Sequence, residues 1–164
     1  MPEAQLDRFL PYLNIGYPEA AEELTMLANT TGSERSDVRA VMSAADVIQL
    51  QALSREVAIS NDLLDYINRI VRATRDRSLP YVEKWIRWGA GPRAGQALAL
   101  SAKARALLAG RFAATMADVH ALAAPVLRHR ILLNFEAEAD RLSTDDVVTE
   151  ILRLVPEPRS PLPK

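Results

Sequence analysis

The sequence contains no cysteine, few aromatic residues and no long apolar run. The absence of cysteine excludes a disulfide framework, thiolate chemistry and any metal site built on Cys. Aromatic residues are 5% of the 164 residues, whereas alanine and leucine supply much of the apolar share, which favours helices over strands. No apolar run reaches the roughly 18 residues needed to cross a bilayer, and no signal-peptide pattern opens the chain. We therefore expect a mainly helical protein, no membrane partner and, by default, a cytoplasmic location.

The sequence also lacks a large excess of positive or of negative residues. The formal net charge is −1, which argues against a dedicated nucleic-acid binder. Four arginines nevertheless gather at the end of a helix predicted from residue 61 to about 77, namely Arg69, Arg72, Arg75 and Arg77. They fit either a nucleic-acid stripe or a solvated helix end whose cations match the helix dipole. The net charge favours the second interpretation, and we expect no nucleic-acid partner.

Motifs of a self-contained active site are absent as well. The sequence has no GxxxxGK[ST] phosphate loop, no GxGxxG after a strand and no GxSxG serine context. His120 and His129 lie nine residues apart without a third ligand at a matching position, so we expect no metal site. The alternating carboxylates of FEAEAD, residues 135–140, lack the EF-hand pattern and predict a hydrated acidic loop.

The spacing of apolar residues predicts a series of helices. Residues 1–10 read as a short helix. Residues 13–15 read as an extended piece that should belong to a sheet, because so short a strand is not stable alone. Further helices are predicted at 19–29, from Ser43 onward, at 61–77, from Pro92 to Gly110, from Thr115 onward and from Thr144 onward. Ser43 and Thr115 are the predicted N-caps of the helices that follow them.

Several segments carry more specific expectations. The helix that follows Ser43 should bury one stripe, formed by Val47, Leu50 and Leu53. Pro125 should break or kink the helix in which it lies. Residues 30–41 predict a loop, residues 81–88 fit either a short helix or a strand, and residues 156–164 form a proline-rich tail.

A glycine-punctuated turn leads into the longest predicted helix, GAGPRAGQALALSAKARALLAG at residues 89–110. Pro92 suits the first helical position, and Gly110 suits the left-handed position just past the end. Arg93 is unusual, because a cation in the first turn faces the positive end of the helix dipole. Free N–H groups and an arginine at one helix start make a good phosphate site. Arg93 extending into water is the other interpretation, and both are open at this stage.

Three ordered motifs resemble the MoxR family of AAA+ ATPases. PEAQLDRF at residues 2–9, followed by GYP at 16–18, is similar to the last segment of the family's ATPase core and its exit into the lid. GAGPRA at residues 89–94 resembles the family's GASPRA motif, with glycine in place of serine. LRHRILLNFEAEA at residues 127–139 is similar to the segment that follows in the lid. The resemblance runs from residue 2 to about residue 155.

The resemblance implies a fold and a division of the chain. The fold would be a helical AAA+ lid subdomain, a helical bundle with a few short extended segments, preceded by a remnant of the α/β ATPase core. Residues 1–16 would be the end of that core, with the arginine-finger helix and the last strand. Residues 17–155 would be the lid, and residues 156–164 the tail.

The resemblance also implies roles for four residues. Arg8 matches the arginine finger, which acts in trans on the nucleotide of a neighbouring subunit and stabilises charge in the transition state. Arg93 matches the sensor-2 arginine, which reaches from the lid to the ATP phosphates of its own subunit. Tyr17 and Pro18 match the hinge between core and lid. No metal ligand is implied within this chain.

Function and partners follow from the same resemblance. Proteins of this family form hexameric rings with chaperone-like or cofactor-insertion roles, often beside partners that carry a von Willebrand factor A domain. Their Walker A, Walker B and sensor-1 elements precede the region matched here. The resemblance therefore implies that ATP and Mg²⁺ bind in the full-length parent, and that this chain alone binds neither and does not hydrolyse ATP. The alternative is a free-standing helical protein-interaction module without nucleotide chemistry.

Overall fold

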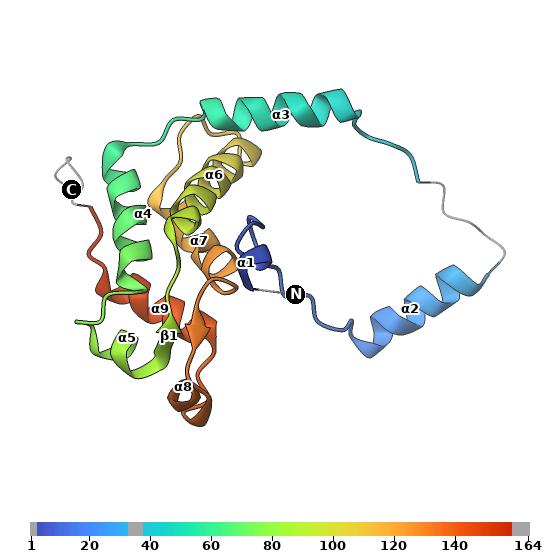
Figure 1. Cartoon of the computed structure of the whole chain (residues 1–164). Coiled ribbons are helices and arrows are strands. Elements are labelled where there is room, and N and C mark those ends of the chain that lie inside the picture. The colour runs from blue at the N-terminus through green and yellow to red at the C-terminus, as the bar shows by residue number, and fades with distance from the viewer. Residues whose placement is uncertain (1–2, 33–37, 159–164) are drawn as a thin grey trace, which may run out of the picture.

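A computed structural model describes residues 3–32 and 38–158 (Figure 1). Three predictions fall partly outside the described residues: Met1 and Pro2 of the first helix, residues 33–37 of the predicted loop, and residues 159–164 of the tail. The fold is mainly helical, as predicted. Its elements in chain order are α1 (Glu3–Leu6), α2 (Ala20–Thr31), α3 (Ala44–Glu56), α4 (Asn61–Ala73), α5 (Pro80–Trp85), β1 (Ile86–Trp88), α6 (Pro92–Leu108), α7 (Met116–Leu127), β2 (Leu132–Leu133), α8 (Phe135–Ala139) and α9 (Thr144–Leu154).

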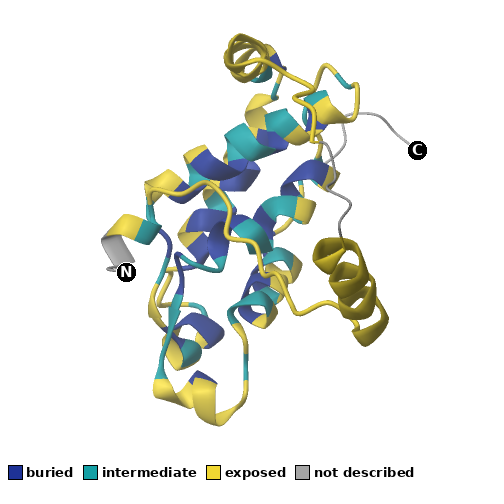
Figure 2. Cartoon of the chain, turned by 90° about the vertical axis from the view of Figure 1, so that its right-hand side faces the viewer, coloured by how far each residue is buried: buried dark blue, intermediate teal, exposed yellow. Residues whose placement is uncertain are grey.

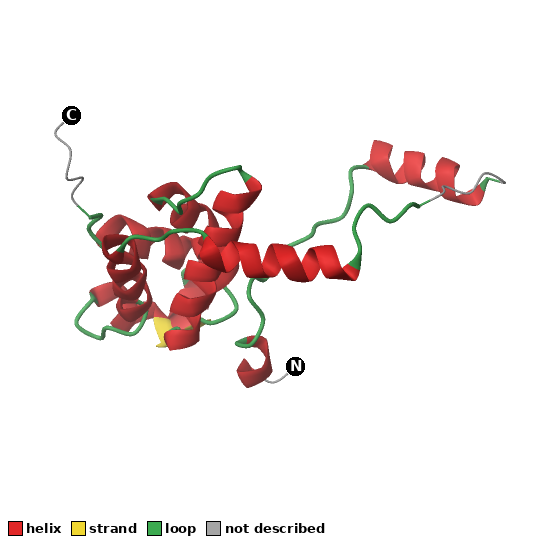
Figure 3. Ribbon diagram, turned by 90° about the horizontal axis from the view of Figure 1, so that it is seen from above, coloured by secondary structure: helices red, strands yellow, loops and turns green. Residues whose placement is uncertain are grey.

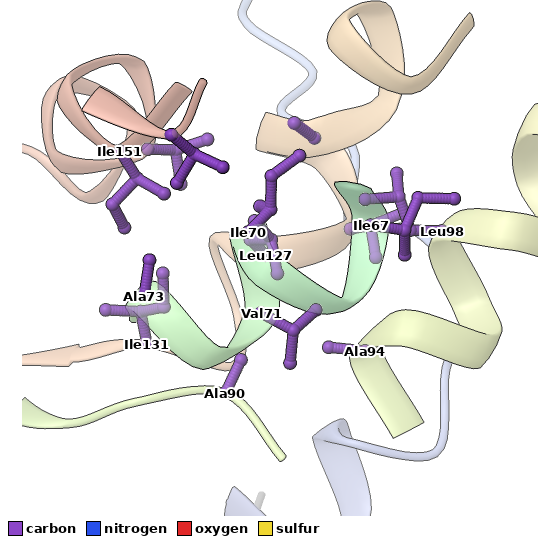
Figure 4. Close-up of a cluster of buried hydrophobic side chains, with 14 of the residues drawn as sticks. Ile67, Ile70, Val71, Ala73, Ala90, Ala94, Leu98, Leu127, Ile131 and Ile151 are labelled. Atoms are coloured by element: carbon purple, nitrogen blue, oxygen red, sulfur yellow. The ribbon is translucent and has the colours of Figure 1, made fainter. Parts of the chain in front are cut away.

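Four helices, α4, α6, α7 and α9, enclose the hydrophobic core. Helix α6 packs most extensively against α7 and also lies against α4 (Figure 1). Figure 4 shows the side chains of α4 in the middle of the cluster, with those of α6, α7 and α9 around them. The buried residues include Leu63, Ile67, Ile70, Val71, Leu98, Val119, Leu127, Val148 and Ile151.

Helix α6 follows its predicted form. Gly91 is the N-cap, Pro92 is the first helical residue, and Gly110 has a left-handed φ of 68°. Its buried face consists mainly of small residues, which let neighbouring helices approach closely. They are Ala94, Ala97, Leu98, Ala102 and Ala106.

A buried carboxylate joins the end of α6 to the start of α7. Asp118 is fully buried and accepts hydrogen bonds from Arg111 at 2.7 and 2.6 Å and from Arg105 at 2.6 Å. It also accepts the backbone N–H of Thr115 at 2.9 Å, which caps α7. The Arg111 guanidinium is the main reason that the pKa of Asp118 lies far below its usual range. The sequence predicted the cap at Thr115 but not this charge cluster.

Residues 81–88, predicted as either a short helix or a strand, contain one of each. Helix α5 runs into β1, which pairs antiparallel with β2, so that Ile86 lies opposite Leu133. The acidic segment after β2 was predicted as a hydrated loop, and that prediction is wrong. It forms α8, because the Asn134 side chain caps the backbone N–H of Ala137 at 3.1 Å. Asp140 then accepts hydrogen bonds from Lys84 and Trp85, both at 2.9 Å.

A break or a kink was predicted at Pro125, and the break does not occur. The helix continues to Leu127, two residues beyond the proline. A proline in the last turn removes a single backbone hydrogen bond, and its fixed φ is compatible with a helix. The carbonyl of Pro125 accepts the N–H of Tyr12 at 2.8 Å, which brings the N-terminal segment against the end of α7.

Two of the arginines that follow α4 bind backbone carbonyls of β1 and of the GAGPRA turn. Arg75 donates to the carbonyl of Ala90 at 3.1 Å, and Arg77 donates to the carbonyl of Ile86 at 2.9 Å. Helix α4 ends at Ala73, earlier than predicted. These two side chains therefore have structural partners, which neither interpretation of the cluster had anticipated.

Helices α2 and α3 contribute nothing to the core. Figures 1 and 3 show α2 far from the packed helices, and α3 next to them near one end only, with the rest of the helix extending past them. The stripe predicted to be buried in α3 is exposed, with Val47 at 44%, Leu50 at 42% and Leu53 at 50%. That prediction is wrong because the described residues offer α3 only a partial partner surface, on α6. Residues 13–15 form no strand here, and Ile15 is 91% exposed.

Candidate functional site

The GAGPRA turn is fixed by the end of α4. A Cβ atom at Gly89 would lie 2.2 Å from the backbone oxygen of Thr74, so only glycine fits there without a shift. The buried hydroxyl of Thr74 accepts the N–H of Ala90 at 2.9 Å and donates to the carbonyl of Val71 at 2.7 Å. This close contact sets the point at which α6 begins, and hence the position of Arg93 on its first turn.

Arg93 is partly exposed and faces a carboxylate of the N-terminal segment. Its Nη1 atom lies 3.7 Å from Oδ2 of Asp7, and its side chain is 58% exposed. Asp7 follows α1 directly and precedes Arg8 in the sequence. The ion pair thus links the predicted sensor residue to the neighbour of the predicted finger residue.

Both predicted arginines line the same hollow. This hollow has a volume of about 360 Å³, and its charged side chains are Asp7, Arg8, Arg93 and Arg130. Arg8 is exposed and has no side-chain hydrogen bond or ion pair within the part of the chain that the structure describes. Three guanidinium groups and one carboxylate leave an excess of positive charge, which suits an anion with several oxygens, such as a polyphosphate.

Arg130 is the site residue that the sequence analysis missed. Its side chain is 2% exposed, and its Nε atom donates to Oδ1 of Asp7 at 3.1 Å. Its Nη atoms donate to the backbone carbonyls of Asp7 at 2.9 Å and Leu10 at 3.0 Å, and also to that of Phe9. Burial lowers the pKa of Arg130, while Asp7 raises it. The only signal was its place in LRHR, which the family resemblance covers.

The residues next to Arg130 hold the same segment. Arg128 donates to the carbonyl of Tyr12 at 3.3 Å and pairs with Asp145 at 2.8 Å. His129 contacts the carbonyl of Phe9 through Nε2 at 3.2 Å and stacks on the ring of Tyr12. The side chains of Arg128, His129 and Arg130, which directly follow α7, therefore all contact residues 7–12.

The predicted hinge residues lie elsewhere. Tyr17 and Pro18 belong to the irregular segment 11–19 that leads into α2, and Tyr17 is 98% exposed. Neither lines the hollow of Arg8 and Arg93. Their assignment as a hinge stays a prediction.

The described residues offer no obvious place for a cation. Within residues 3–32 and 38–158, no three His, Cys, Asp or Glu side chains come together as a metal site. The carboxylate of the hollow already accepts from Arg130, so the hollow fits phosphate oxygens and does not fit Mg²⁺. His120 instead pairs with the hydroxyl of Tyr66 at 3.0 Å. Among the described helices, none is both long enough and apolar enough to cross a membrane.

The sequence matches a family model and two known relatives. The family model for the AAA lid domain matches residues 81–151. The chain is 34% identical to chaperone MoxR1 of Mycobacterium tuberculosis over 162 residues, which are 97% of this chain and 43% of the relative. It is 36% identical to the uncharacterized protein YeaC of Bacillus subtilis over 159 residues, 96% of this chain and 48% of the relative.

A solved structure is similar as well. A protein of Cytophaga hutchinsonii, described as a candidate ATPase, matches with a TM-score of 0.89 and 33% identity over 97% of this chain and 49% of that chain. The chain spans less than half the length of each of these three proteins. Residues 81–151 thus match the AAA lid domain, and nearly the whole chain is similar to one part of chaperone MoxR1 and of the Cytophaga hutchinsonii protein.

Proposed function

We propose that this chain is the lid portion, with the arginine-finger segment, of a MoxR-type AAA+ ATPase. The parent protein would act as a homo-oligomeric ring in the cytoplasm, with ATP and Mg²⁺ bound by an AAA+ core. Its cycle would drive chaperone-like remodelling or cofactor insertion in a partner protein, and the resemblance extends this to a partner with a von Willebrand factor A domain. The observation that carries the proposal is the hollow shared by Arg8 and Arg93.

The shared hollow also bears on which nucleotide each arginine contacts. The family resemblance alone assigned Arg8 to a neighbour's nucleotide and Arg93 to the nucleotide of its own subunit. In this chain the two side chains line one hollow, and Asp7 lies against Arg93. This geometry supports one polyphosphate, held by a neighbouring core, that both guanidinium groups approach together. Charge that develops on the transferred phosphoryl group would then be stabilised by two cations from the same lid.

A second candidate function, a helical protein-interaction module without nucleotide chemistry, has a separate observation in its favour. Helices α2 and α3 present large apolar side chains to solvent, among them Leu24, Met26, Leu27, Ile48 and Leu53. Exposed apolar side chains at helical spacing are typical of surfaces that bind another protein. Binding of a partner that is independent of ATP and unaffected by Arg8→Ala or Arg93→Ala would favour this function.

The first experiment measures ATP hydrolysis by a protein that carries both these residues and an AAA+ core. Arg8→Ala should lower kcat by about 10³-fold or more, because arginine fingers contribute on that scale. Arg93→Ala should also abolish most turnover. Arg72→Ala is the matched control, since Arg72 is an exposed arginine outside the hollow, and it should leave the rate unchanged. Turnover by the 164-residue chain alone that Arg93→Ala abolishes would contradict the proposal.

Mixing the two variants tests whether they serve one nucleotide. If finger and sensor act on different nucleotides, a mixed ring of Arg8→Ala and Arg93→Ala subunits contains intact sites and regains activity. If both side chains approach the same nucleotide, each site in an alternating ring still lacks one arginine, and activity stays low. We expect no recovery. Recovery of turnover would overturn the shared site while leaving the ATPase assignment in place.

A further inference from the structure

The segment that carries Arg8 is attached to the end of α7 by an unusual set of bonds. Most of them run from side chains of α7 and its C-terminal turn to backbone carbonyls of residues 7–12. Arg130 donates to the carbonyls of Asp7, Phe9 and Leu10. In the other direction, the N–H of Tyr12 donates to the carbonyl of Pro125 at 2.8 Å. We call the contacts of Arg128, His129 and Arg130 with residues 7–12 the clamp.

The clamp does not serve the hydrophobic core. Residues 8–12 are all exposed, and none of them belongs to the buried cluster. Arg130, by contrast, is almost fully buried and still directs most of its donors at this segment. One further bond goes to the carbonyl of Val126, near the end of α7. Burying a cation is unfavourable unless its donors find partners, so the segment supplies the partners that make this position tolerable.

The clamp is continuous with the site. The carboxylate of Asp7 accepts from Arg130 through Oδ1 at 3.1 Å and faces Arg93 through Oδ2 at 3.7 Å. Arg8 is bonded covalently to Asp7. The finger residue, the clamp and the first turn of α6 therefore form one connected set of contacts, with Asp7 in the middle.

We propose that Arg130 is a positioning residue that fixes the arginine-finger segment to the lid, so that Arg8 and Arg93 move as one body. This inference rests on the proposed function for its catalytic consequence only. A lid that rotated without its finger segment would change the separation of the two guanidinium groups. The clamp prevents that change, so any lid rotation presents or withdraws both cations together.

The planar fork of arginine is essential to this role. Three carbonyls and a carboxylate are reached from one guanidinium, whose donors point in fixed directions. A lysine at this position keeps the charge but offers one compact ammonium group. Arg130→Lys should therefore release part of the segment while disturbing the lid less than a neutral substitution would.

Hydrogen exchange on the 164-residue chain tests the clamp directly. In the wild type, the amide of Tyr12 should be protected. Arg130→Lys should speed its exchange by about tenfold or more, because several hydrogen bonds that close the segment are lost together. Asp7→Ala, which truncates the segment side and leaves the lid core intact, should also speed it. Arg72→Lys should change nothing. Unchanged protection of Tyr12 in both Arg130→Lys and Asp7→Ala would overturn the clamp.

Hydrolysis by the protein with an AAA+ core then tests the catalytic consequence. Arg130→Lys should lower kcat and leave KM for ATP unchanged, and it should add little to the loss caused by Arg8→Ala. A fall in kcat accompanied by an equal loss of folded protein, with Tyr12 still protected, would make Arg130 merely structural and would overturn the proposal. If that protein has no ATPase activity, the proposed function fails, while the exchange experiment still decides whether the clamp exists.

Discussion

Residues 5–56 and residues 57–155 use the same local signals and reach different degrees of burial. Among the described side chains before Val57, none is buried, whereas the following hundred residues contain the whole hydrophobic core (Figure 2). Helices α3 and α9 illustrate this difference in burial, because they begin with the same capping motif. Each begins with a Ser–Asp capping box, Ser43 with Asp46 and Ser143 with Asp146. Helix α9 buries three side chains in the core and α3 buries none.

The difference between α3 and α9 shows that the capping box and the apolar stripe determine separate properties of a helix. A capping box satisfies free N–H groups and sets where a helix starts, whatever lies beside the helix. Burial needs a surface on the other side of the apolar stripe, and α9 finds it on α4 and α7. Isolated helices of 12 or 13 residues, the lengths of α2 and α3, are marginal in water. Stability should therefore be concentrated in residues 57–155.

The largest expected effect on stability comes from making the same leucine-to-alanine substitution in each of the two regions. Leu98 is fully buried between α6 and its neighbours, whereas Leu24 in α2 is 68% exposed. Leu98→Ala should lower the free energy of unfolding by about 3 kcal/mol, since it removes buried methyl groups and leaves a cavity. Leu24→Ala should change it by less than about 0.5 kcal/mol, as exposed substitutions usually do. Urea unfolding followed by circular dichroism measures both. A comparable loss for Leu24→Ala would show that α2 packs against something in solution.

A smaller effect is expected from alanine at two glycines. A Cβ at Gly89 would overlap the backbone of Thr74, whereas a Cβ at Gly16 would meet no atom within 4 Å beyond its chain neighbours. Gly89→Ala should cost about 2 kcal/mol, because the overlap forces the GAGPRA turn to shift. Gly16→Ala should be close to neutral. Thermal unfolding gives both values. A neutral Gly89→Ala would mean that the turn, and with it Arg93, is held less tightly than these contacts indicate.

The difference between local signals and packing partners explains which predictions from the sequence succeeded. Local signals predicted the cap at Ser43, the proline start of α6 and the glycine at its end. The stripe of α3 and the break at Pro125 were wrong, because both depend on what lies nearby or on the place within the helix. The loop predicted at residues 135–140 was also wrong, because the Asn134 side chain caps a helix there.

The site shows a similar limit. Arg8 and Arg93 were found through motifs, and the structure places them in one hollow. Arg130 was missed, because an arginine gives no sequence signal of its own burial, and its partners are carbonyls more than a hundred residues earlier. Backbone carbonyls carry no sequence signature at all. Contacts of this kind emerge only when the fold brings the two segments together.

The smallest effect concerns the junction of the two regions, where His129 meets residues 7–12. Its Nε2 atom is placed to donate to the carbonyl of Phe9, and its buried Nδ1 atom has no hydrogen-bond partner in the described part of the chain. Burial is the main cause that lowers the pKa of His129, and the charge of Arg130 adds to it. The folded protein thus favours neutral His129, because burial and Arg130 outweigh the opposing effects of Asp7 and of the carbonyls of Phe9 and Pro125.

The sign of the pH dependence follows. Because the pKa of His129 is lower in the folded protein than its ordinary value of about 6.5, its contribution to stability is complete above that value. It is lost as the pH falls through the folded pKa. Between pH 7 and pH 5 the wild type should lose more thermal stability than His129→Gln, which has no titrating ring, and the contribution of other groups is common to both proteins. The amide of Tyr12, corrected for its intrinsic exchange rate, should lose protection over the same range in the wild type alone. Equal pH dependence in the two proteins would show that residues 7–12 are held to α7 without any contribution from the neutral His129 ring.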